Sequence, residues 1–228
     1  MYTTILWDID NTLLDFNASE KYAFDTCLEN AGLTPSDELL AAYSRINLSF
    51  WKMLERGEIT RDELLAQRFV RFFDSMGITG VDTDLFKDTY QTLLGSTYYY
   101  LDDSLALCQR LHQTHRQYIV TNGVASTQRN KLALSGLDQY FDGCFISEEL
   151  GCEKPSPAFF DKSFSRIANF RKEDAVIIGD SLTSDMRGGN NAGIACCWYN
   201  PHGLPAPADV RLDYIIKNLW AILPIIDG

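Results

Sequence analysis

The pattern of apolar and polar positions divides the chain into stretches of different periodicity. Residues 4–9 form a short, almost continuous apolar run, which predicts a buried strand with Asp8 near its C-terminal end. From residue 17 to residue 97 the apolar positions follow helical spacing, as at 39, 40, 43, 46, 50, 51 and 54. Beyond residue 98, short apolar runs alternate with helical patterns. The pattern therefore predicts two structural parts.

Capping signals support helices in the first of these parts. Thr34 followed by Pro35 predicts one helix start. Thr60 and Glu63 predict another, because Thr and Glu at this spacing form a capping box. Glycines stand where helices are expected to end: Gly32, Gly57 and Gly77. We expect residues 17–97 to form a bundle of about four helices.

The remainder of the chain has the pattern of an α/β protein. After the strand at 4–9, strands are expected at 117–121, 144–147, 175–178, 194–198 and 214–216. Helices are expected between them, including one at 125–135 that stops at Gly136. Strands alternating with helices favour a doubly wound, Rossmann-like parallel sheet covered on both faces. We therefore expect an α/β core of residues 1–16 and 98–228, with the helical segment 17–97 inserted as a cap.

Composition narrows the class of partner. The 228 residues are 46% hydrophobic, enough for a sizeable core, and carry a formal net charge of −11. This charge disfavours nucleic-acid polymers and anionic membranes. The six cysteines show no metal-binding or disulfide spacing, and neither a signal peptide nor a membrane span is evident. We expect a cytoplasmic protein with a small-molecule substrate, and both a monomer and a dimer stay open.

Polar residues follow four of the expected strands. They are Asp8 and Asp10, Thr121 and Asn122, Lys154, and Asp180 with Asp185. Ligands of doubly wound sheets bind beyond the carboxyl ends of the strands, so these side chains are expected to converge. Carboxylate oxygens suit Mg²⁺. Each signal alone is an ordinary turn, cap or surface lysine, and it is their joint occurrence that indicates a site.

Together these motifs resemble the haloacid dehalogenase (HAD) superfamily of phosphohydrolases. The matching residues are Asp8 to Thr12, Thr121 to Gly123, Lys154-Pro155, and Gly179 to Asp185. The resemblance implies a phosphatase with Asp8 as nucleophile and Asp10 as general acid and base. It implies that Thr121 and Lys154 hold the phosphoryl group. It further implies Mg²⁺ bound by Asp8, by the main-chain carbonyl of Asp10 and by Asp180, with Asp185 adjusting that shell. Asn122 either contacts the phosphate or shapes its own turn.

The inserted helices resemble the family's type-one cap, which selects the substrate. Within that segment Asn47, Phe50, Trp51 and Arg68 resemble the branch that hydrolyses pyrimidine nucleoside monophosphates. One aromatic side chain is expected to stack on a base, with Asn47 and Arg68 as polar partners. Phe50 and Trp51 also fit an ordinary apolar helix face.

Three other functions fit parts of the pattern. A haloacid dehalogenase has no use for a second acid at the position of Asp10. A sugar-phosphate phosphatase or phosphomutase with the same core stays open, because only the cap differs. A catalytically silent binding module is disfavoured because all the motif residues are present.

Overall fold

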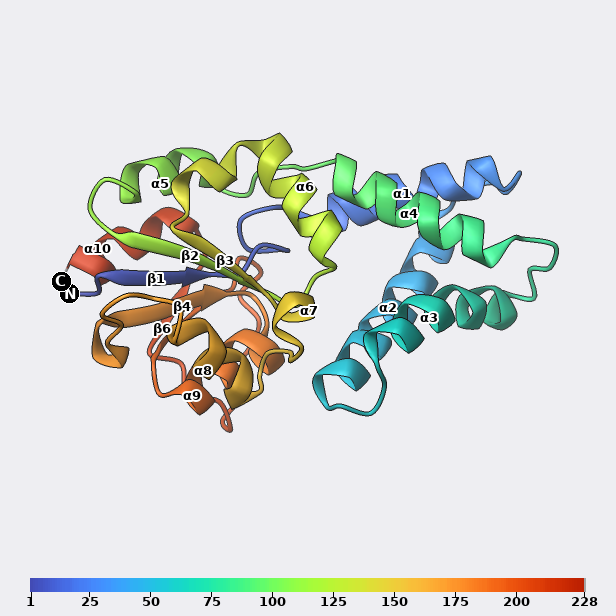
Figure 1. The fold of residues 1–228 in the computed structure, drawn as a ribbon. Helices are drawn as coiled ribbons and strands as arrows, with labels where there is room; N and C mark the ends of the chain where they lie inside the picture. The colour runs from blue at the N-terminus through green and yellow to red at the C-terminus, as the bar shows by residue number, and fades with distance from the viewer. Residues whose placement is uncertain (228) are drawn as a thin grey trace. The chain divides into compact units, whose positions relative to one another are not determined.

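The structure, a computed structural model, describes residues 1–227 and contains two compact units. One unit consists of Met1–Phe16 and the chain from Tyr98 onward, and the other is Asn17–Thr97 (Figure 1). Within the described residues, no helix is both long and apolar enough to cross a membrane.

The first unit is built on a parallel sheet of six strands in the order β3-β2-β1-β4-β5-β6. The strands are β1 (Thr4–Trp7), β2 (Arg116–Thr121), β3 (Gly143–Ile146), β4 (Ala175–Gly179), β5 (Ala195–Tyr199) and β6 (Tyr214–Ile216). The first strand, β1, lies between β2 and β4, and Trp7 is in register with Ile119 on one side and Ile178 on the other. This arrangement confirms the predicted doubly wound α/β class and brings the carboxyl ends of β1, β2 and β4 together.

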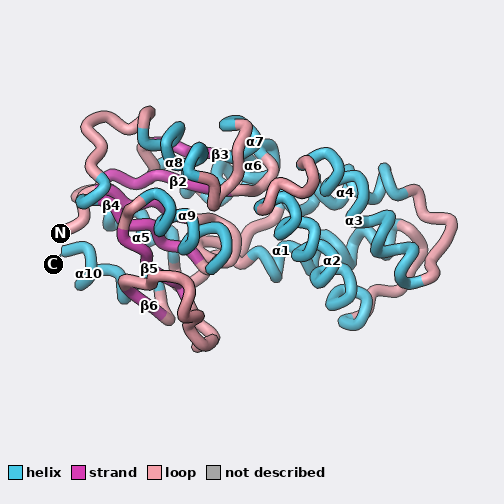
Figure 2. Tube along the Cα trace, turned by 90° about the horizontal axis from the view of Figure 1, so that it is seen from below, coloured by secondary structure: helices cyan, strands magenta, loops and turns pink. Residues whose placement is uncertain are grey.

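Helices cover both faces of this sheet, as Figures 1 and 2 show. Ile5 and Trp7 of β1 belong to one buried cluster and Leu6 to the other, as expected of a strand buried on both faces. The first cluster includes side chains of α5 (Ser104–Leu111), α6 (Ala125–Ser135) and α10 (Leu223–Asp227). The second includes side chains of α8 (Pro157–Phe164) and α9 (Arg187–Ala192).

Short elements complete the first unit. They are η1 (Leu137–Tyr140), α7 (Ser147–Leu150), η2 (Lys172–Asp174), η3 (Leu182–Met186) and η4 (Leu219–Ile222). Between β4 and β5, where the alternating pattern predicts a helix, the chain forms the π-helical turn η3 followed by α9. The predicted strand at 4–9 ends earlier, at Trp7, so that Asp8 is the first residue beyond it.

The second unit contains α2 (Asp37–Glu55), α3 (Arg61–Met76), α4 (Thr83–Ser96) and most of α1 (Phe16–Asn30). Its interior is aromatic, with the ring of Tyr43 stacked between Phe24 and Phe69. The capping box of Thr60 and Glu63 is present as predicted. The helix start predicted at Thr34-Pro35 is wrong, because Ser36 caps α2 by accepting a hydrogen bond from the Leu39 N–H at 3.2 Å.

Candidate active site

The register of β1 and β4 brings Asp8 beside the loop that carries Asp180. The Asp8 N–H donates to the Ile178 carbonyl at 3.0 Å, which continues the ladder one residue past β1. Thr12 connects the two loops, since its hydroxyl oxygen accepts the Asp180 N–H at 3.1 Å and lies 3.4 Å from Asp8 Oδ2. Thr12 is fully buried. It therefore links the ends of two strands that are far apart in sequence.

Three carboxylates converge at this point. Asp8, Asp180 and Asp185 each offer an oxygen atom, and these atoms lie within 4.8 Å of one another. Asp185 comes from the π-helical turn after β4, and its Oδ2 accepts the Ser181 N–H at 3.1 Å. A Cβ atom on Gly179 would lie 2.2 Å from Asp185 Oδ2, so only glycine leaves room for this approach. Steric space for the Asp185 carboxylate thus explains why a glycine precedes Asp180.

Lys154 supplies the positive charge next to these carboxylates. Its Nζ donates to Asp8 Oδ1 at 2.8 Å, to Asp185 Oδ1 at 2.6 Å and to the Val120 carbonyl at 2.7 Å. These bonds use all three hydrogens of the ammonium, which is 1% exposed. The lysine therefore joins the loop after β1, the end of β2 and the turn after β4.

The electrostatics of the cluster follow from burial of several like charges. Burial raises the pKa of Asp8 to about 7, and the neighbouring Asp185 and Asp10 add to the rise while Lys154 opposes it. The pKa of Asp180 is raised well above its ordinary value, first by burial and then by Asp8 and Asp185. Burial alone lowers the pKa of Lys154, but Asp185 and Asp8 more than offset this, and the net shift is upward.

This donor set fits a hard divalent cation. Three carboxylates share one lysine, so full ionisation leaves two negative charges without a countercharge in a buried place. Oxygen donors of this number suit Mg²⁺, which also keeps waters or substrate oxygens as ligands. Asp8, Asp180 and Asp185, three of the ligands expected from the sequence, are the residues whose carboxylates meet and could hold such an ion.

Asp10 faces a different neighbour. Its Oδ1 accepts a hydrogen bond from Lys131 Nζ at 2.9 Å, and its Oδ2 accepts one from Gln128 Nε2 at 2.6 Å. Both donors lie on α6, and each residue is 1% exposed. The carboxylate of Asp10 is thus directed at α6, whereas those of Asp8, Asp180 and Asp185 are directed at one another.

Thr121 and Asn122 lie at the end of β2. The Thr121 hydroxyl oxygen accepts the Gly123 N–H at 3.1 Å and Gln128 Nε2 at 2.9 Å, which leaves its own hydrogen to donate. The side chain of Asn122 bonds to the main chain of Lys154, with Oδ1 accepting the N–H at 2.8 Å and Nδ2 donating to the carbonyl at 2.9 Å. Asn122 thereby fixes the backbone that carries the lysine.

Comparison with known proteins identifies the family. A family model of haloacid dehalogenase-like hydrolases matches residues 2–193. HAD-hydrolase YfnB of Bacillus subtilis is 36% identical over 226 residues, covering 99% of this chain and 96% of YfnB. The chain belongs to the haloacid dehalogenase-like hydrolase family. This confirms the family resemblance of the motifs.

Other comparisons of this hydrolase cover nearly its whole length. The structure superposes on the crystal structure of YfnB bound to magnesium with a TM-score of 0.93. The match covers 100% of this chain and 99% of the YfnB chain. Pyrimidine 5'-nucleotidase PynA of Streptococcus pneumoniae is 37% identical over 99% of this chain and 95% of its own. Pyrimidine 5'-nucleotidase YjjG of Escherichia coli is 26% identical over 94% of this chain and 93% of its own.

Gln128 and Lys131 lie outside the motifs, and the sequence did not predict them as residues of the site. Helix α6 was predicted, but its buried face is polar, consisting of Thr127, Gln128, Lys131 and Ser135 besides Leu132. These four polar residues recur at helical spacing, and the helix has no clear apolar stripe. That pattern is a signal from which a functional polar face of the helix could have been predicted.

The predicted base-contacting residues of the helical unit differ in exposure. Asn47 and Arg68 are 3% and 2% exposed, and Arg68 Nη1 donates to Asn47 Oδ1 at 3.0 Å. Their polar groups are therefore directed at one another inside the bundle. Phe50 and Trp51 are half-buried, and the Arg61 guanidinium lies 5.6 Å from the centroid of the Trp51 ring.

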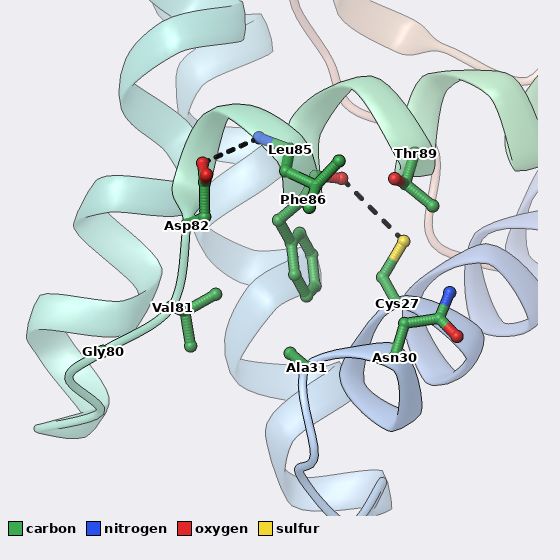
Figure 3. Close-up of a pocket in the computed structure, with 9 residues that line it drawn as sticks. All are labelled: Cys27, Asn30, Ala31, Gly80, Val81, Asp82, Leu85, Phe86 and Thr89. Atoms are coloured by element: carbon green, nitrogen blue, oxygen red, sulfur yellow. Dashed lines mark hydrogen bonds between the residues drawn. The ribbon is translucent and has the colours of Figure 1, made fainter.

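The helical unit also contains a cavity of about 320 Å³ between the end of α1 and the start of α4 (Figure 3). Phe86 forms part of its wall, and the Cys27 thiol contacts the Phe86 carbonyl at 3.8 Å. None of the residues predicted from the motifs lines this cavity.

Proposed function

We propose that this hydrolase is a magnesium-dependent phosphatase that forms a covalent aspartyl-phosphate on Asp8. One observation carries the proposal: the carboxylates of Asp8, Asp180 and Asp185 meet within 4.8 Å beside the buried ammonium of Lys154. A phosphate monoester needs both a nucleophile and positive charge on its oxygens. These residues supply both.

The ion would be held by Asp8, the main-chain carbonyl of Asp10 and Asp180, with Asp185 in support, and would neutralise charge on the phosphoryl oxygens. Lys154 has a related part. It favours the ionised form of Asp8 and orients it through its bond to Oδ1, whereas burial works against ionisation. Asn122 holds the lysine in place through its main chain.

The first step attaches the phosphoryl group to Asp8. A carboxylate oxygen of Asp8 forms a bond to phosphorus, and the bond from phosphorus to the ester oxygen breaks. Asp10 gives its proton to the departing alkoxide, which leaves as an alcohol. The hydroxyl hydrogen of Thr121 is free to donate to a phosphoryl oxygen, because other groups use the lone pairs of Oγ1.

The second step releases phosphate. Asp10, now ionised, takes a proton from water, and the water oxygen bonds to phosphorus. The bond from phosphorus to the Asp8 oxygen breaks, which restores the Asp8 carboxylate and returns the proton to Asp10 for the next cycle. The two steps consume one ester and one water and yield one alcohol and one phosphate.

For the substrate we propose pyrimidine nucleoside monophosphates. The support is the similarity to PynA and YjjG over nearly the whole chain, together with the half-buried Trp51 on α2. An aromatic ring that stacks on a base contributes roughly 1–3 kcal/mol. Such a contribution is enough for a preference of about 5- to 150-fold over a sugar phosphate that lacks a base.

The test is kcat/KM measured side by side on dUMP, dTMP, UMP, AMP and several hexose phosphates. We expect the pyrimidine nucleotides to rank first and Trp51→Ala to lower kcat/KM for nucleotides more than for hexose phosphates. Trp51→Phe is the matched control, since it keeps an aromatic face. If hexose phosphates rank first, the nucleotidase proposal is wrong and the phosphatase proposal stands. If no monoester is turned over with Mg²⁺ present, both are wrong.

A further inference from the structure

The buried polar face of α6 ends on Asp10. Lys131 Nζ lies 2.9 Å from Asp10 Oδ1, and Gln128 Nε2 lies 2.6 Å from Oδ2, so each carboxylate oxygen has its own donor from one helix. The side chain of Asp10 is 27% exposed and that of Lys131 only 1%. A lysine this buried has lost most of its hydration, which is costly unless an acid compensates its charge. Asp10 is the acid that pairs with Lys131.

Gln128 joins Asp10 to the phosphoryl-binding candidate Thr121. One Nε2 hydrogen bonds to Asp10 Oδ2 and the other to Thr121 Oγ1 at 2.9 Å. In its ionised form Asp10 can only accept hydrogen bonds, and the amide nitrogen of Gln128 faces it accordingly. Gly123 makes room for this position, since a Cβ there would lie 2.1 Å from Gln128 Nε2.

Lys131 is held from a second side. Its Nζ lies 5.3 Å from the ring centroid of Phe16, at the start of α1. A cation near an aromatic face is attracted by the ring quadrupole. The ammonium thus lies near both the acid and the ring, which restricts its position.

We propose that Lys131 and Gln128 are positioning residues for the reaction, which fix the carboxylate of Asp10 for proton transfer to the leaving group. The inference rests on the proposed phosphatase function, in which Asp10 is the general acid. The ion pair limits rotation of the carboxylate from one side, and the amide limits it from the other. Proton transfer depends steeply on the distance between donor and acceptor, so a freed carboxylate loses rate even where Asp10 itself is present.

The experiment compares two substrates that differ in their need for a proton. Departure of p-nitrophenolate needs little protonation, whereas departure of the 5'-hydroxyl of a nucleoside needs a general acid. Because kcat/KM covers only the steps up to this departure, it isolates the acid role of Asp10 from its later role as base. We expect Lys131→Met to lower kcat/KM for dUMP by about 10- to 100-fold, the usual effect of losing a supporting residue. For p-nitrophenyl phosphate we expect kcat/KM to fall less than about 3-fold, because protonation by the general acid contributes little to the departure of p-nitrophenolate.

Two controls separate positioning from a structural role. Lys87→Met removes another lysine–aspartate pair, that of Lys87 with Asp84 at 3.0 Å on α4, and should leave both substrates unchanged. Lys131→Arg keeps a donor and should recover most of the dUMP activity. In an Asp10→Asn background, Lys131→Met should add less than about 3-fold, since residues that act through one another are not additive.

Gln128→Met tests the same proposal without removing a charge, and it remains decisive if Lys131→Met does not fold. It should show the same difference between dUMP and p-nitrophenyl phosphate. Equal losses on both substrates, or a loss that is additive with Asp10→Asn, would mean that α6 only supports the fold. A wild-type enzyme inactive on both substrates would instead overturn the phosphatase proposal, so the two failures are distinguishable.

Discussion

The ammonium of Lys154 lies 2.8 Å from Oδ1 of Asp8 although 146 residues separate them along the chain. The same Nζ reaches Asp185 and the Val120 carbonyl, so the lysine has no hydrogen left for a further partner in this arrangement. Any contact with a phosphoryl group therefore requires one of these bonds to be exchanged or shared. Lys154 both orients the proposed nucleophile and offsets the repulsion among the carboxylates.

Lys154→Met is expected to remove most of the activity. Without the ammonium, Asp8 and Asp185 lose their only shared cation among the described residues. Lys154 also lowers the pKa of Asp8, so its removal raises that pKa further and leaves less of the ionised nucleophile. We expect kcat on p-nitrophenyl phosphate to fall at least about 100-fold, as when one transition-state donor is lost. The matched control is Lys162→Met, since Lys162 also bonds a carbonyl, that of Leu150 at 2.6 Å. If Lys154→Met were as active as this control, Lys154 would have no role in catalysis and the prediction would be wrong.

Asp8→Asn is expected to fold and to show no turnover above background. Asparagine keeps the size of the side chain but is a poor nucleophile, so no acyl phosphate forms. Asp10→Asn is expected to lose about 10²- to 10⁴-fold, the usual worth of general acid–base catalysis. The check is mass spectrometry after rapid acid quench with substrate, which should find a phosphoryl group on the peptide containing Asp8. A phosphorylated serine or histidine would contradict the mechanism.

The stability of the metal-free protein is expected to fall as pH rises. The pKa of Asp8 is about 7 when folded and 3.8 in its ordinary state. Between about pH 4 and pH 7 the folded state thus holds a proton that the unfolded state has released, and the free energy of unfolding decreases with pH. The upward shift of the Asp180 pKa acts in the same direction.

Magnesium is expected to reverse this trend, because it binds the ionised carboxylates of the folded state. Thermal melts at pH 5 and pH 8, with EDTA or with Mg²⁺, measure the effect. The rise in Tm on adding Mg²⁺ should be larger at pH 8. Asp8→Asn is the control and should flatten the pH dependence of the metal-free protein. A Tm that increases with pH in EDTA would show that burial of these carboxylates is not costly.

The sequence located the residues at the strand ends because topology alone brings them together. Asp8, Lys154 and Asp180 each follow a buried strand of a parallel sheet, and the carboxyl ends of such strands share one edge. Predicting that these residues converge therefore requires the order and direction of the strands but no side-chain geometry. The convergence of Asp185 with Asp8 additionally depends on the turn η3, which carries Asp185 to a place that only a glycine at position 179 leaves open.

The partners of Asp10 could not be obtained in this way. Lys131 is 121 residues from Asp10 in sequence and lies on a helix, so its direction depends on which face of α6 packs against the sheet. A mixed face that buries Leu132 together with Gln128 and Lys131 has no apolar stripe to reveal it. The helix start predicted at Thr34-Pro35 was wrong for a local reason. Thr34, Ser36 and Asp37 are all good capping residues, and the sequence does not rank them.

Asn47 and Arg68 hold the helical unit together through buried hydrogen bonds. Asn47 Nδ2 donates to Glu20 Oε1 at 2.9 Å while its Oδ1 accepts from Arg68 at 3.0 Å, so one amide bridges a buried carboxylate and a buried guanidinium. Arg68 Nη2 also donates to Gln91 Oε1 at 2.9 Å, which ties α3 to α4. Burial raises the pKa of Glu20, and the hydrogen bonds from Ser44 and Asn47 and the charge of Arg68 counter this rise.

Arg68→Met is expected to destabilise residues 17–97 by about 3–5 kcal/mol, because removing one member of a buried charged network leaves the others uncompensated. Arg56→Met is the matched control, since Arg56 and Glu58 form an exposed ion pair, and such pairs contribute little to stability. Amide hydrogen exchange resolved by peptide should become faster in α2, α3 and α4 of Arg68→Met while peptides of the sheet keep their rates. Because Asn47 and Arg68 bond to each other, Asn47→Leu combined with Arg68→Met should cost clearly less than the sum of the single changes. If Arg68→Met instead leaves exchange unchanged and raises only KM for nucleotides, its guanidinium contacts the substrate rather than the bundle, as the sequence pattern first indicated.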